Sequence, residues 1–409
     1  MIPVSEPVLA GNELGYLRDC VATGWISSSG KYIERFEQGW AGYCGKRHGI
    51  AVANGTAALQ IAIDALRLDP GDEIIMPSFT IISCALAAVR AGATPVVVDS
   101  DPETYCIDVR QAAAAITSRT RAIMPVHIYG HPVDIDPLLD LAEKNGVAIV
   151  EDAAQAHGCE YLSCRDGQKA WRRCGGLGTV SAFSFYANKL VTTGEGGMVL
   201  TDSDALAERC RSLRNLCFQP RRFYHEEFGY NYRLTNMQAA VGVAQVERMS
   251  DILDRKRRIG ALYDALLADV PGIALPPRRE RARTNNWMYS LVLEDEVEMD
   301  AFEFATRLKA EGVDTRPFFM GMHEQPALRA RGLFEGVCLP VAERLHRRGV
   351  LVPSGLALTE EQVETVARAV KAVLASATQS TFTGRRGRQR RQSLNRPATR
   401  SGVNGSANA

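Results

Sequence analysis

Short apolar runs alternate with longer amphipathic segments over the first 150 residues of the chain. The runs are rich in Val and Ile, which predicts buried strands, and the segments between them repeat apolar residues at roughly helical spacing. We predict strands at 49–53, 73–76, 95–98, 122–128 and 147–150, and helices at 57–66, 84–91, 109–116 and 137–145. This alternation is typical of an α/β fold with a mostly parallel sheet flanked by helices.

The segment 181–200, SAFSFYANKLVTTGEGGMVL, predicts two short strands joined by a glycine-rich turn. Lys189 lies just after the first of these strands. A lysine in such a place usually extends its amine to the surface. A desolvated lysine instead loses its proton readily and attacks a carbonyl carbon to form a Schiff base. Lys189 is therefore a candidate nucleophile, with a surface lysine as the alternative.

Polar side chains follow the predicted strands, at the edge of a parallel sheet where ligands collect. They are Asn54, Ser78, His127, Tyr129, Glu151, Asp152, Gln155 and His157. Asp152 could bind a metal, a ribose hydroxyl or a protonated ring nitrogen, or cap a helix. Gly55 and Thr56 open the helix at 57–66, where free backbone N–H groups favour a phosphate, although an ordinary N-cap has the same sequence.

A phosphate-binding site, a carboxylate and a lysine, in this order along the chain, are the groups that bind pyridoxal phosphate. The lysine holds the aldehyde, the carboxylate keeps the pyridine nitrogen protonated, and backbone amides and hydroxyls bind the phosphate. The hydroxyl of Ser184, five residues before Lys189, is a further candidate phosphate ligand. No single residue is specific for the cofactor, whereas the ordered set is.

The chain resembles the sugar aminotransferases of the DegT/DnrJ/EryC1/StrS family, from about residue 2 to residue 376. The resemblance lies in five motifs: Trp25–Ser28, Asn54–Leu59, Glu151–Gln155, Ser184–Gly197 and Gly229–Asn236. It implies a fold-type I pyridoxal phosphate enzyme, with a mostly parallel seven-stranded sheet and a smaller C-terminal α+β domain. We accordingly expect a large domain at 1–264, a small domain at 265–377 and a tail at 378–409.

The resemblance also implies roles for individual residues. Lys189 would bond the cofactor and shuttle protons, Asp152 would pair with the pyridinium nitrogen, and Gln155 would reach the ring hydroxyl. Gly55, Thr56 and Ser184 would bind the phosphate. Asn231 would reach the phosphate in the neighbouring subunit of a homodimer with shared active sites. Substrate contacts are expected from Trp287, Arg316, the loop 318–323 and His323 within it.

The expected reaction moves an amino group from glutamate to a nucleotide-linked 4-keto-6-deoxy sugar, in deoxyamino-sugar, glycan or natural-product biosynthesis. A GDP-linked sugar is favoured, and a dTDP- or UDP-linked sugar aminated at C3 or C4 is the alternative. A non-catalytic regulator that binds pyridoxal phosphate is less favoured, because Lys189, Asp152 and Gln155 are all present. Lys189 also argues against the dehydrating member of the family, which has His at this position.

Two departures from the family pattern concern the edges of the site. Ile81 stands where the family often has an aromatic residue that stacks on the cofactor ring, so we expect altered cofactor affinity rather than loss. The loop 163–178 is longer and more basic than usual, and Thr179 replaces a common Asp.

Amino-acid composition limits the class of protein and its cellular location. Hydrophobic residues make up 46% of the 409 residues and charged residues 23%, values of an ordinary globular protein. No apolar run approaches the length of a membrane span, and no signal peptide is visible, so we expect a cytoplasmic protein. The ten cysteines are scattered without a CxxC pair, which favours reduced thiols over a zinc site at Cys159, Cys164 and Cys174.

The tail at 378–409 is rich in Arg, Gly, Ser and Gln and is predicted to be disordered. Its arginines could contact nucleic acid, but a solvated extension without function is favoured.

Overall fold

The predicted strands form one seven-stranded sheet with the order β1-β9-β8-β5-β4-β2-β3. The structure, a computed structural model, describes residues 1–221 and 223–393. The strands are β1 His48–Val52, β2 Glu73–Pro77, β3 Thr94–Val98, β4 Thr120–Ile123, β5 Ala148–Asp152, β8 Val180–Ser184 and β9 Gly197–Thr201. Only β9 runs antiparallel to its neighbours, β1 and β8. The predicted mostly parallel sheet is therefore confirmed.

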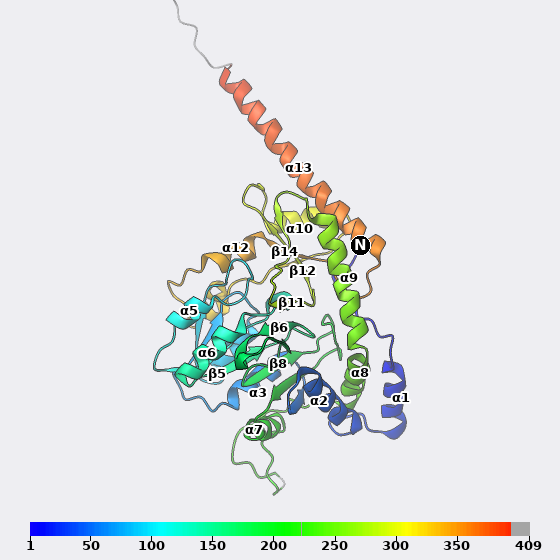
Figure 1. Cartoon of the computed structure of the whole chain (residues 1–409), viewed down its shortest axis with the longest axis vertical. Helices are drawn as coiled ribbons and strands as arrows, with labels where there is room; N and C mark the ends of the chain where they lie inside the picture. The colour runs from blue at the N-terminus through cyan, green and yellow to red at the C-terminus, as the bar shows by residue number, and fades with distance from the viewer. Residues whose placement is uncertain (222, 394–409) are drawn as a thin grey trace, which may run out of the picture.

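Helices cover both faces of this sheet, as its buried strands require. They are α2 Lys31–Cys44, α3 Gly55–Asp64, α4 Ser83–Arg90, α5 Val109–Ala114, α6 Ile135–Asn145 and α7 Asp204–Arg214. Helix α3 packs on β8 and β9, while α2 packs beside β1 (Figure 1). The contact between α3 and β8 matters for function, since it brings Gly55 next to the strand that precedes Lys189.

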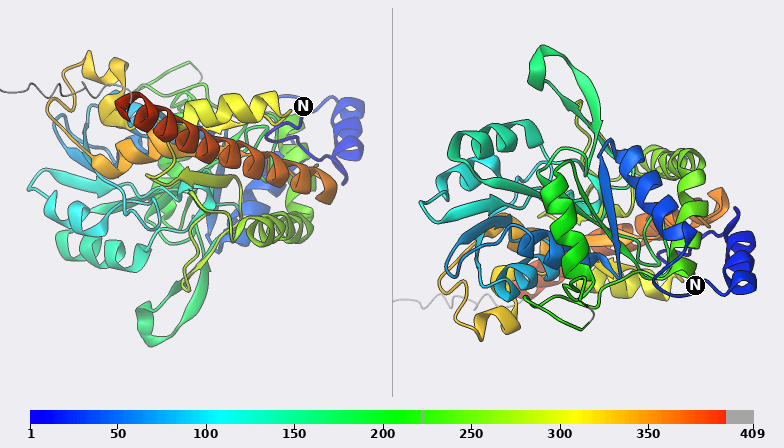
Figure 2. Two further views of the ribbon diagram at one scale, coloured as in Figure 1. Left: turned by 90° about the horizontal axis from the view of Figure 1, so that it is seen from above. Right: turned by 90° about the horizontal axis from the view of Figure 1, so that it is seen from below.

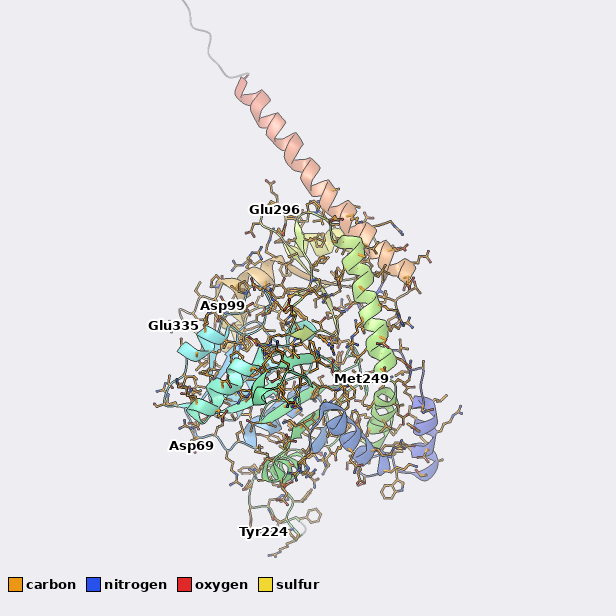
Figure 3. All side chains as sticks on the ribbon, in the orientation of Figure 1. Asp69, Asp99, Tyr224, Met249, Glu296 and Glu335 are labelled. Carbon is orange, nitrogen blue, oxygen red and sulfur yellow. The ribbon has the colours of Figure 1, made fainter. Side chains whose placement is uncertain are left out.

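Two consecutive helices, α8 Asn236–Glu247 and α9 Met249–Leu267, run along one side of the molecule (Figure 1). The sequence predicts their boundary between residues 253 and 254, but the break falls at Arg248, whose φ of −107° and ψ of 13° leave the α-helical region. Met249, labelled in Figure 3, is buried at this junction. The helical spacing of apolar residues continues across Arg248, so the sequence pattern by itself puts the boundary between the two helices at the wrong residue. The N-terminal helix α1 Glu13–Thr23 packs on α8.

A second hydrophobic cluster gathers around a four-stranded antiparallel sheet with the order β10-β12-β14-β13. Its strands are β10 Ile273–Ala274, β12 Tyr289–Leu293, β13 Arg316–Pro317 and β14 Gly349–Val352. The helices of this part are α10 Ala301–Ala310, α11 Pro326–Arg329, α12 Pro340–Arg348 and α13 Glu360–Ser393. The cluster begins within α9, at Ile259 and Tyr263, so α9 contributes to both parts of the molecule. In Figure 3, Glu296 lies in this part and Tyr224 at the opposite end of the molecule.

A small third sheet, β11-β6-β7, includes a hairpin that projects from the body (Figure 2). Its strands are β6 Glu160–Ser163, β7 Ala170–Arg173 and β11 Ala282–Arg283. The segment at 162–178, predicted to be an exposed hairpin or loop, thus contains most of this hairpin. Three 3-10 turns, η1 Ile128–Gly130, η2 Arg165–Gly167 and η3 Met322–Glu324, complete the fold.

The C-terminal segment differs from its prediction. Helix α13 was expected to end near residue 375 and disorder to begin at 378, but the helix continues to Ser393 and extends away from the body (Figure 1). Arg and Gln, abundant here, are good helix formers, which the compositional argument for disorder neglects. Residues 394–409 of the predicted tail lie outside the described residues. Within the described part of the chain, no helix is both long and apolar enough to cross a membrane.

Candidate active site

A cavity of about 680 Å³ lies at the carboxyl ends of the parallel strands, between the large sheet and the smaller part of the molecule. Of the predicted site residues it is lined by Gly55, Thr56, Asp152, Gln155, Ser184, Lys189, Trp287 and Arg316. These residues come from segments up to 261 positions apart (316 − 55). The fold therefore brings most of the predicted constellation to one space.

The floor of the cavity includes the N-terminus of α3. Asn54 caps this helix, its side chain accepting a hydrogen bond from the N–H of Ala57 at 2.9 Å. The first N–H groups of a helix lack partners within the helix and favour an anion. At Gly55 a Cβ would lie 2.6 Å from the Cβ of Ser184, so only glycine allows α3 to approach β8 this closely. The Thr56 hydroxyl lies 2.9 Å from that of Ser83.

Lys189 is partly buried, and its amine faces the cavity wall formed by Trp287. The Nζ atom lies 3.8 Å from the centre of the Trp287 ring, and the Trp287 indole N–H donates to the carbonyl of Asn188 at 2.8 Å. Burial lowers the pKa of Lys189 from 10.5 to about 7, an effect that the negative charge of Asp152 opposes. A substantial fraction of Lys189 is therefore uncharged near neutral pH, as a nucleophile or a base requires.

Asp152 ends β5 and is buried. Its Oδ1 accepts a hydrogen bond from the N–H of Ala154 at 3.0 Å, and its Oδ2 accepts one from the thiol of Cys84 at 3.2 Å. Burial raises the pKa of Asp152, whereas these two donors and the charge of Lys189 lower it. A cationic N–H partner in the cavity would stabilise the carboxylate further.

Gln155 is buried one turn after Asp152. Its Oε1 accepts a hydrogen bond from the N–H of Tyr129 at 2.7 Å, and Tyr129 has the unusual φ of 50°. Because this contact uses the carbonyl oxygen, the amide nitrogen of Gln155 is the group suited to donate to a ligand. This agrees with an acceptor such as a ring hydroxyl oxygen.

The other strand-end residues do not all face the cavity. Asn54 and Tyr129 line it, but Ser78, His127, Glu151 and His157 do not. His127 donates from Nε2 to buried Glu151 at 2.9 Å, and Glu151 also accepts hydrogen bonds from the backbone N–H groups of Gly175, Leu177 and Gly178. His157 is enclosed by the rings of Trp40, Phe183 and Phe185, and burial lowers its pKa to about 3.

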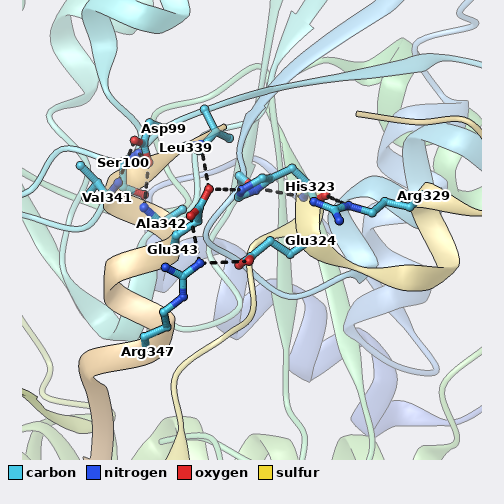
Figure 4. A network of polar contacts seen from close by, with 11 residues as sticks. Asp99, Ser100, His323, Glu324, Arg329, Leu339, Val341, Ala342, Glu343 and Arg347 are labelled. Carbon is cyan, nitrogen blue, oxygen red and sulfur yellow. Dashed lines mark hydrogen bonds and ion pairs between the residues drawn. The ribbon is translucent and has the colours of Figure 1, made fainter. Parts of the chain in front are cut away.

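His323 lies outside the cavity, contrary to the expectation that it borders the substrate. It is buried, with its Nδ1 2.7 Å from the hydroxyl of Ser78 and its Nε2 3.4 Å from Glu343 (Figure 4). Glu343 also pairs with Arg347 at 3.0 Å. These partners lie far away in the sequence or on another element, so the sequence could not show that they occupy the ring. His323 instead fastens the loop 318–323 to the end of β2.

Asn231 also lies outside the cavity of its own chain, and its side chain accepts a hydrogen bond from Arg233. Its expected role concerns the neighbouring subunit and stays a prediction. Ile81, which replaces a common aromatic residue, lines the cavity and is 42% exposed. Thr179 lies outside it, accepting a hydrogen bond from the N–H of Ile149 at 3.1 Å.

Several residues at the cavity are not among the predicted site residues. Tyr186, Phe302, Phe319 and His346 line the cavity, and Cys84 contacts Asp152 from behind. Tyr186 lies in the motif Ser184–Gly197 and Phe319 in the loop 318–323, whereas no local sequence signal marks Cys84, Phe302 or His346.

The donor set fits pyridoxal phosphate. The glycine-lined N-terminus of α3 suits its phosphate, buried Asp152 suits a protonated ring nitrogen, and the Lys189 amine suits an aldehyde. No group of three His, Cys, Asp or Glu residues that could hold a metal occurs among the residues that the structure describes.

Known proteins resemble this chain over nearly its whole length. The model of the DegT/DnrJ/EryC1/StrS aminotransferase family matches residues 7–371. GDP-perosamine synthase of Caulobacter vibrioides is 40% identical over 375 residues, covering 91% of this chain and 98% of the relative. The dTDP-3-amino-3,4,6-trideoxy-alpha-D-glucose transaminase of Streptomyces venezuelae is 38% identical over 353 residues, covering 85% of this chain and 89% of the relative.

The fold also resembles that of solved aminotransferase structures. The crystal structure of the aminotransferase TlmJ from Streptoalloteichus hindustanus superposes with a TM-score of 0.84 at 31% identity, covering 92% of this chain and all of that one. The predicted resemblance to the family, and the fold class inferred from it, are thereby confirmed.

Proposed function

Because the chain belongs to the DegT/DnrJ/EryC1/StrS aminotransferase family, we propose that it is a pyridoxal phosphate-dependent enzyme that transfers the amino group of glutamate to a nucleotide-linked 4-keto-6-deoxy sugar. The proposal rests on one observation. Lys189, Asp152 and the N-terminus of α3 all line the same cavity. The substrate is GDP-linked, a choice supported by the similarity to GDP-perosamine synthase. The motifs His127–Pro132, Asn188–Lys189 and Asn286–Met288 most resemble that enzyme.

The cofactor would be held by residues at three points of the cavity. Gly55, Thr56 and Ser184 would bind its phosphate, Asp152 would accept the hydrogen bond of its ring nitrogen, and Lys189 would bond its aldehyde. Bound there, pyridoxal phosphate supplies an electron-withdrawing ring and an aldehyde that carries the amino group between substrates.

Lys189 is the group that moves protons. In the first half-reaction its uncharged Nζ would remove the proton from Cα of glutamate. The amino group would stay with the cofactor, and water would supply the keto oxygen of the departing 2-oxoglutarate. In the second half-reaction Nζ returns a proton to the sugar carbon that gains the amino group. Since the pKa of Lys189 is lowered to about 7, activity should rise with pH through this value on the acid side of the pH profile.

The nucleotide-sugar would extend to the outer wall of the cavity. This wall contains the aromatic rings of Phe302 and Phe319 and the exposed guanidinium of Arg316. A guanidinium is suited to a diphosphate, and aromatic rings are suited to a sugar face or a base.

We further propose a homodimer with shared sites. The exposed apolar side chains of Leu14, Val21, Trp25 and Ile26 on α1 and the following loop form a surface that a second copy would cover. Asn231, outside the cavity of its own chain, would reach the phosphate in the other subunit. A cytoplasmic location fits the ten free cysteines of the described residues.

The decisive variant is Lys189→Ala. It should abolish amino transfer and also prevent borohydride from fixing added pyridoxal phosphate to the peptide that contains residue 189, as read by mass spectrometry. Lys46→Met is the matched control, because Lys46 is also shielded but lies outside the cavity and should leave both readouts intact. Retention of transfer and fixation in Lys189→Ala would refute the proposal.

The nucleotide is tested by incubating the enzyme with glutamate and GDP-, UDP- or dTDP-linked keto sugars. We expect amination of the GDP-linked sugar, detected by mass spectrometry. Preferential amination of the dTDP-linked sugar would instead support the alternative suggested by the Streptomyces venezuelae relative.

A further inference from the structure

A second buried lysine lies close to the catalytic one. Lys256, on α9, is only 2% exposed. Its contacts among the described residues include no ion pair with a carboxylate, and its amine donates to backbone carbonyls instead. Burial of an ammonium without an acidic partner costs free energy, which here lowers the pKa of Lys256 to about 7. Because Lys256 is buried, solvation at the surface cannot explain why a lysine occupies this position.

The two carbonyls that Lys256 joins lie next to the ends of two different strands of the smaller sheet. Nζ donates to the carbonyl of Trp287, at 3.1 Å, and to that of Ser354. The Ser354 hydroxyl donates to the same Trp287 carbonyl at 3.2 Å. Trp287 precedes β12, and Ser354 follows β14. The backbone of Trp287 is thus fastened to α9 and to the end of β14 together.

Trp287 in turn contacts Lys189 through its side chain. The indole N–H donates to the carbonyl of Asn188 at 2.8 Å, and the ring lies 3.8 Å from the Lys189 amine. The face of an aromatic ring attracts an ammonium group. The chain of contacts from Lys256 through Trp287 therefore reaches the amine of Lys189 in two steps.

Both lysines and Trp287 line a second cavity of about 10 Å³. This is about the space that one water molecule needs. The titratable groups facing Lys189 are Asp152 and His157 on the side of the large sheet, and Lys256 and Glu6 across this small cavity.

We infer that Lys256 is a positioning residue that holds Trp287 against the amine of Lys189 and so adjusts how readily that amine takes up a proton. The inference deepens the proposed function and rests on it, since it assigns a part to a group outside the catalytic cavity.

The test measures the titration of Lys189 without requiring the cofactor or turnover. The full chain, freed of cofactor, is acetylated in trace amounts at a series of pH values, and mass spectrometry gives the midpoint for Lys189. In Lys256→Met the ring that shields the Lys189 amine is released and water reaches the amine. Because burial is the main cause of the lowered pKa of Lys189, the midpoint should rise by about half a pH unit or more.

Trp287→Phe tests whether Lys256 affects Lys189 through the Trp287 ring. If Lys256 acts through Trp287, this variant, whose smaller ring covers the Lys189 amine less, should also raise the midpoint, and adding Lys256→Met to it should produce little further change. Lys256→Gln, which replaces the ammonium group by an amide on a shorter side chain, should change the midpoint in the same direction and serves if the Met variant does not fold.

Lys46→Met is again the matched control. Lys46 donates to the carbonyl of Gly178 at 3.0 Å and pairs with Asp202, far from the cavity, so the Lys189 midpoint should not move. An unchanged midpoint in folded Lys256→Met or Lys256→Gln, or fully additive shifts with Trp287→Phe, would overturn the inference. Either result would leave the proposed amino transfer intact, because that proposal is tested separately, by transfer and fixation in Lys189→Ala.

Discussion

Asp152 shows how single contacts set the chemistry of the site. The carboxylate is buried, which favours its protonated form and raises its pKa, and the hydrogen bonds from Ala154 and Cys84 oppose this effect by stabilising the charged form. The Cys84 thiol is itself fully buried, and its pKa is raised well above the usual value, so it acts here as a donor and not as a nucleophile. Only a charged Asp152 can keep a pyridine nitrogen protonated.

Cys84→Ala should therefore raise the pKa of Asp152. A hydrogen bond to a charged group contributes about 1.5–3 kcal/mol, or about one to two pH units. The pKa of Asp152 is raised, so its ionised form is lost at a higher pH, and the pH below which the affinity for added pyridoxal phosphate falls should move upward. Cys84→Ser, which keeps a donor, should lie close to wild type. Identical profiles for the Ala variant and wild type would show that the thiol does not support the charge.

At the scale of elements, the site depends on the close approach of α3 to the strands β8 and β9. A Cβ at Gly197 would lie 2.3 Å from the carbonyl of Asn54, and one at Gly55 would collide with Ser184. Two glycines on different elements thus let the helix N-terminus reach the strand ends. The cap by Asn54 fixes the first turn whose N–H groups would bind the phosphate.

Asn54→Ala removes this cap. The free energy of unfolding in urea should fall by about 1 kcal/mol, and the affinity for added pyridoxal phosphate, measured by titration of absorbance, should fall as the first turn loosens.

Ser203→Ala at the cap of α7 is the matched control, since Ser203 accepts from the N–H of Leu206 away from the cavity. It should lower stability without changing cofactor affinity. Equal affinities in both variants would contradict a phosphate seat at α3.

At the scale of the whole molecule, the cavity lies between the large sheet and the smaller part, and α9 belongs to both. His323 fastens the loop at 318–323 to Ser78 at the end of β2. It also contacts Glu343, as Figure 4 shows. The proposed second subunit would complete this arrangement with Asn231.

The shared site predicts complementation between two impaired variants. Lys189→Ala and Asn231→Ala chains, unfolded together and refolded, should recover about a quarter of wild-type activity, because half of randomly formed dimers are mixed and each has one intact site. Each variant refolded alone is the control and should stay impaired. Absence of recovery in mixed dimers verified by mass would argue that Asn231 serves its own chain.

The sequence by itself determined the alternation of strands and helices, the turn before β9 and the places of Lys189 and Asp152 at strand ends. These features follow from local spacing: apolar periodicity decides which strands are buried, and chain direction in a parallel sheet decides where their ends meet. The resemblance to a family added the roles of these residues and the cofactor.

Only the tertiary structure decided which strand-end side chains face the cavity. Asn54, Tyr129, Asp152 and Gln155 do so, while His157 packs among aromatic rings. The contacts of Cys84 with Asp152, of His323 with Ser78 and of Lys256 with Trp287 join residues 68, 245 and 31 positions apart. Side-chain partners at such separations are set by packing between elements, which local spacing along the chain does not encode.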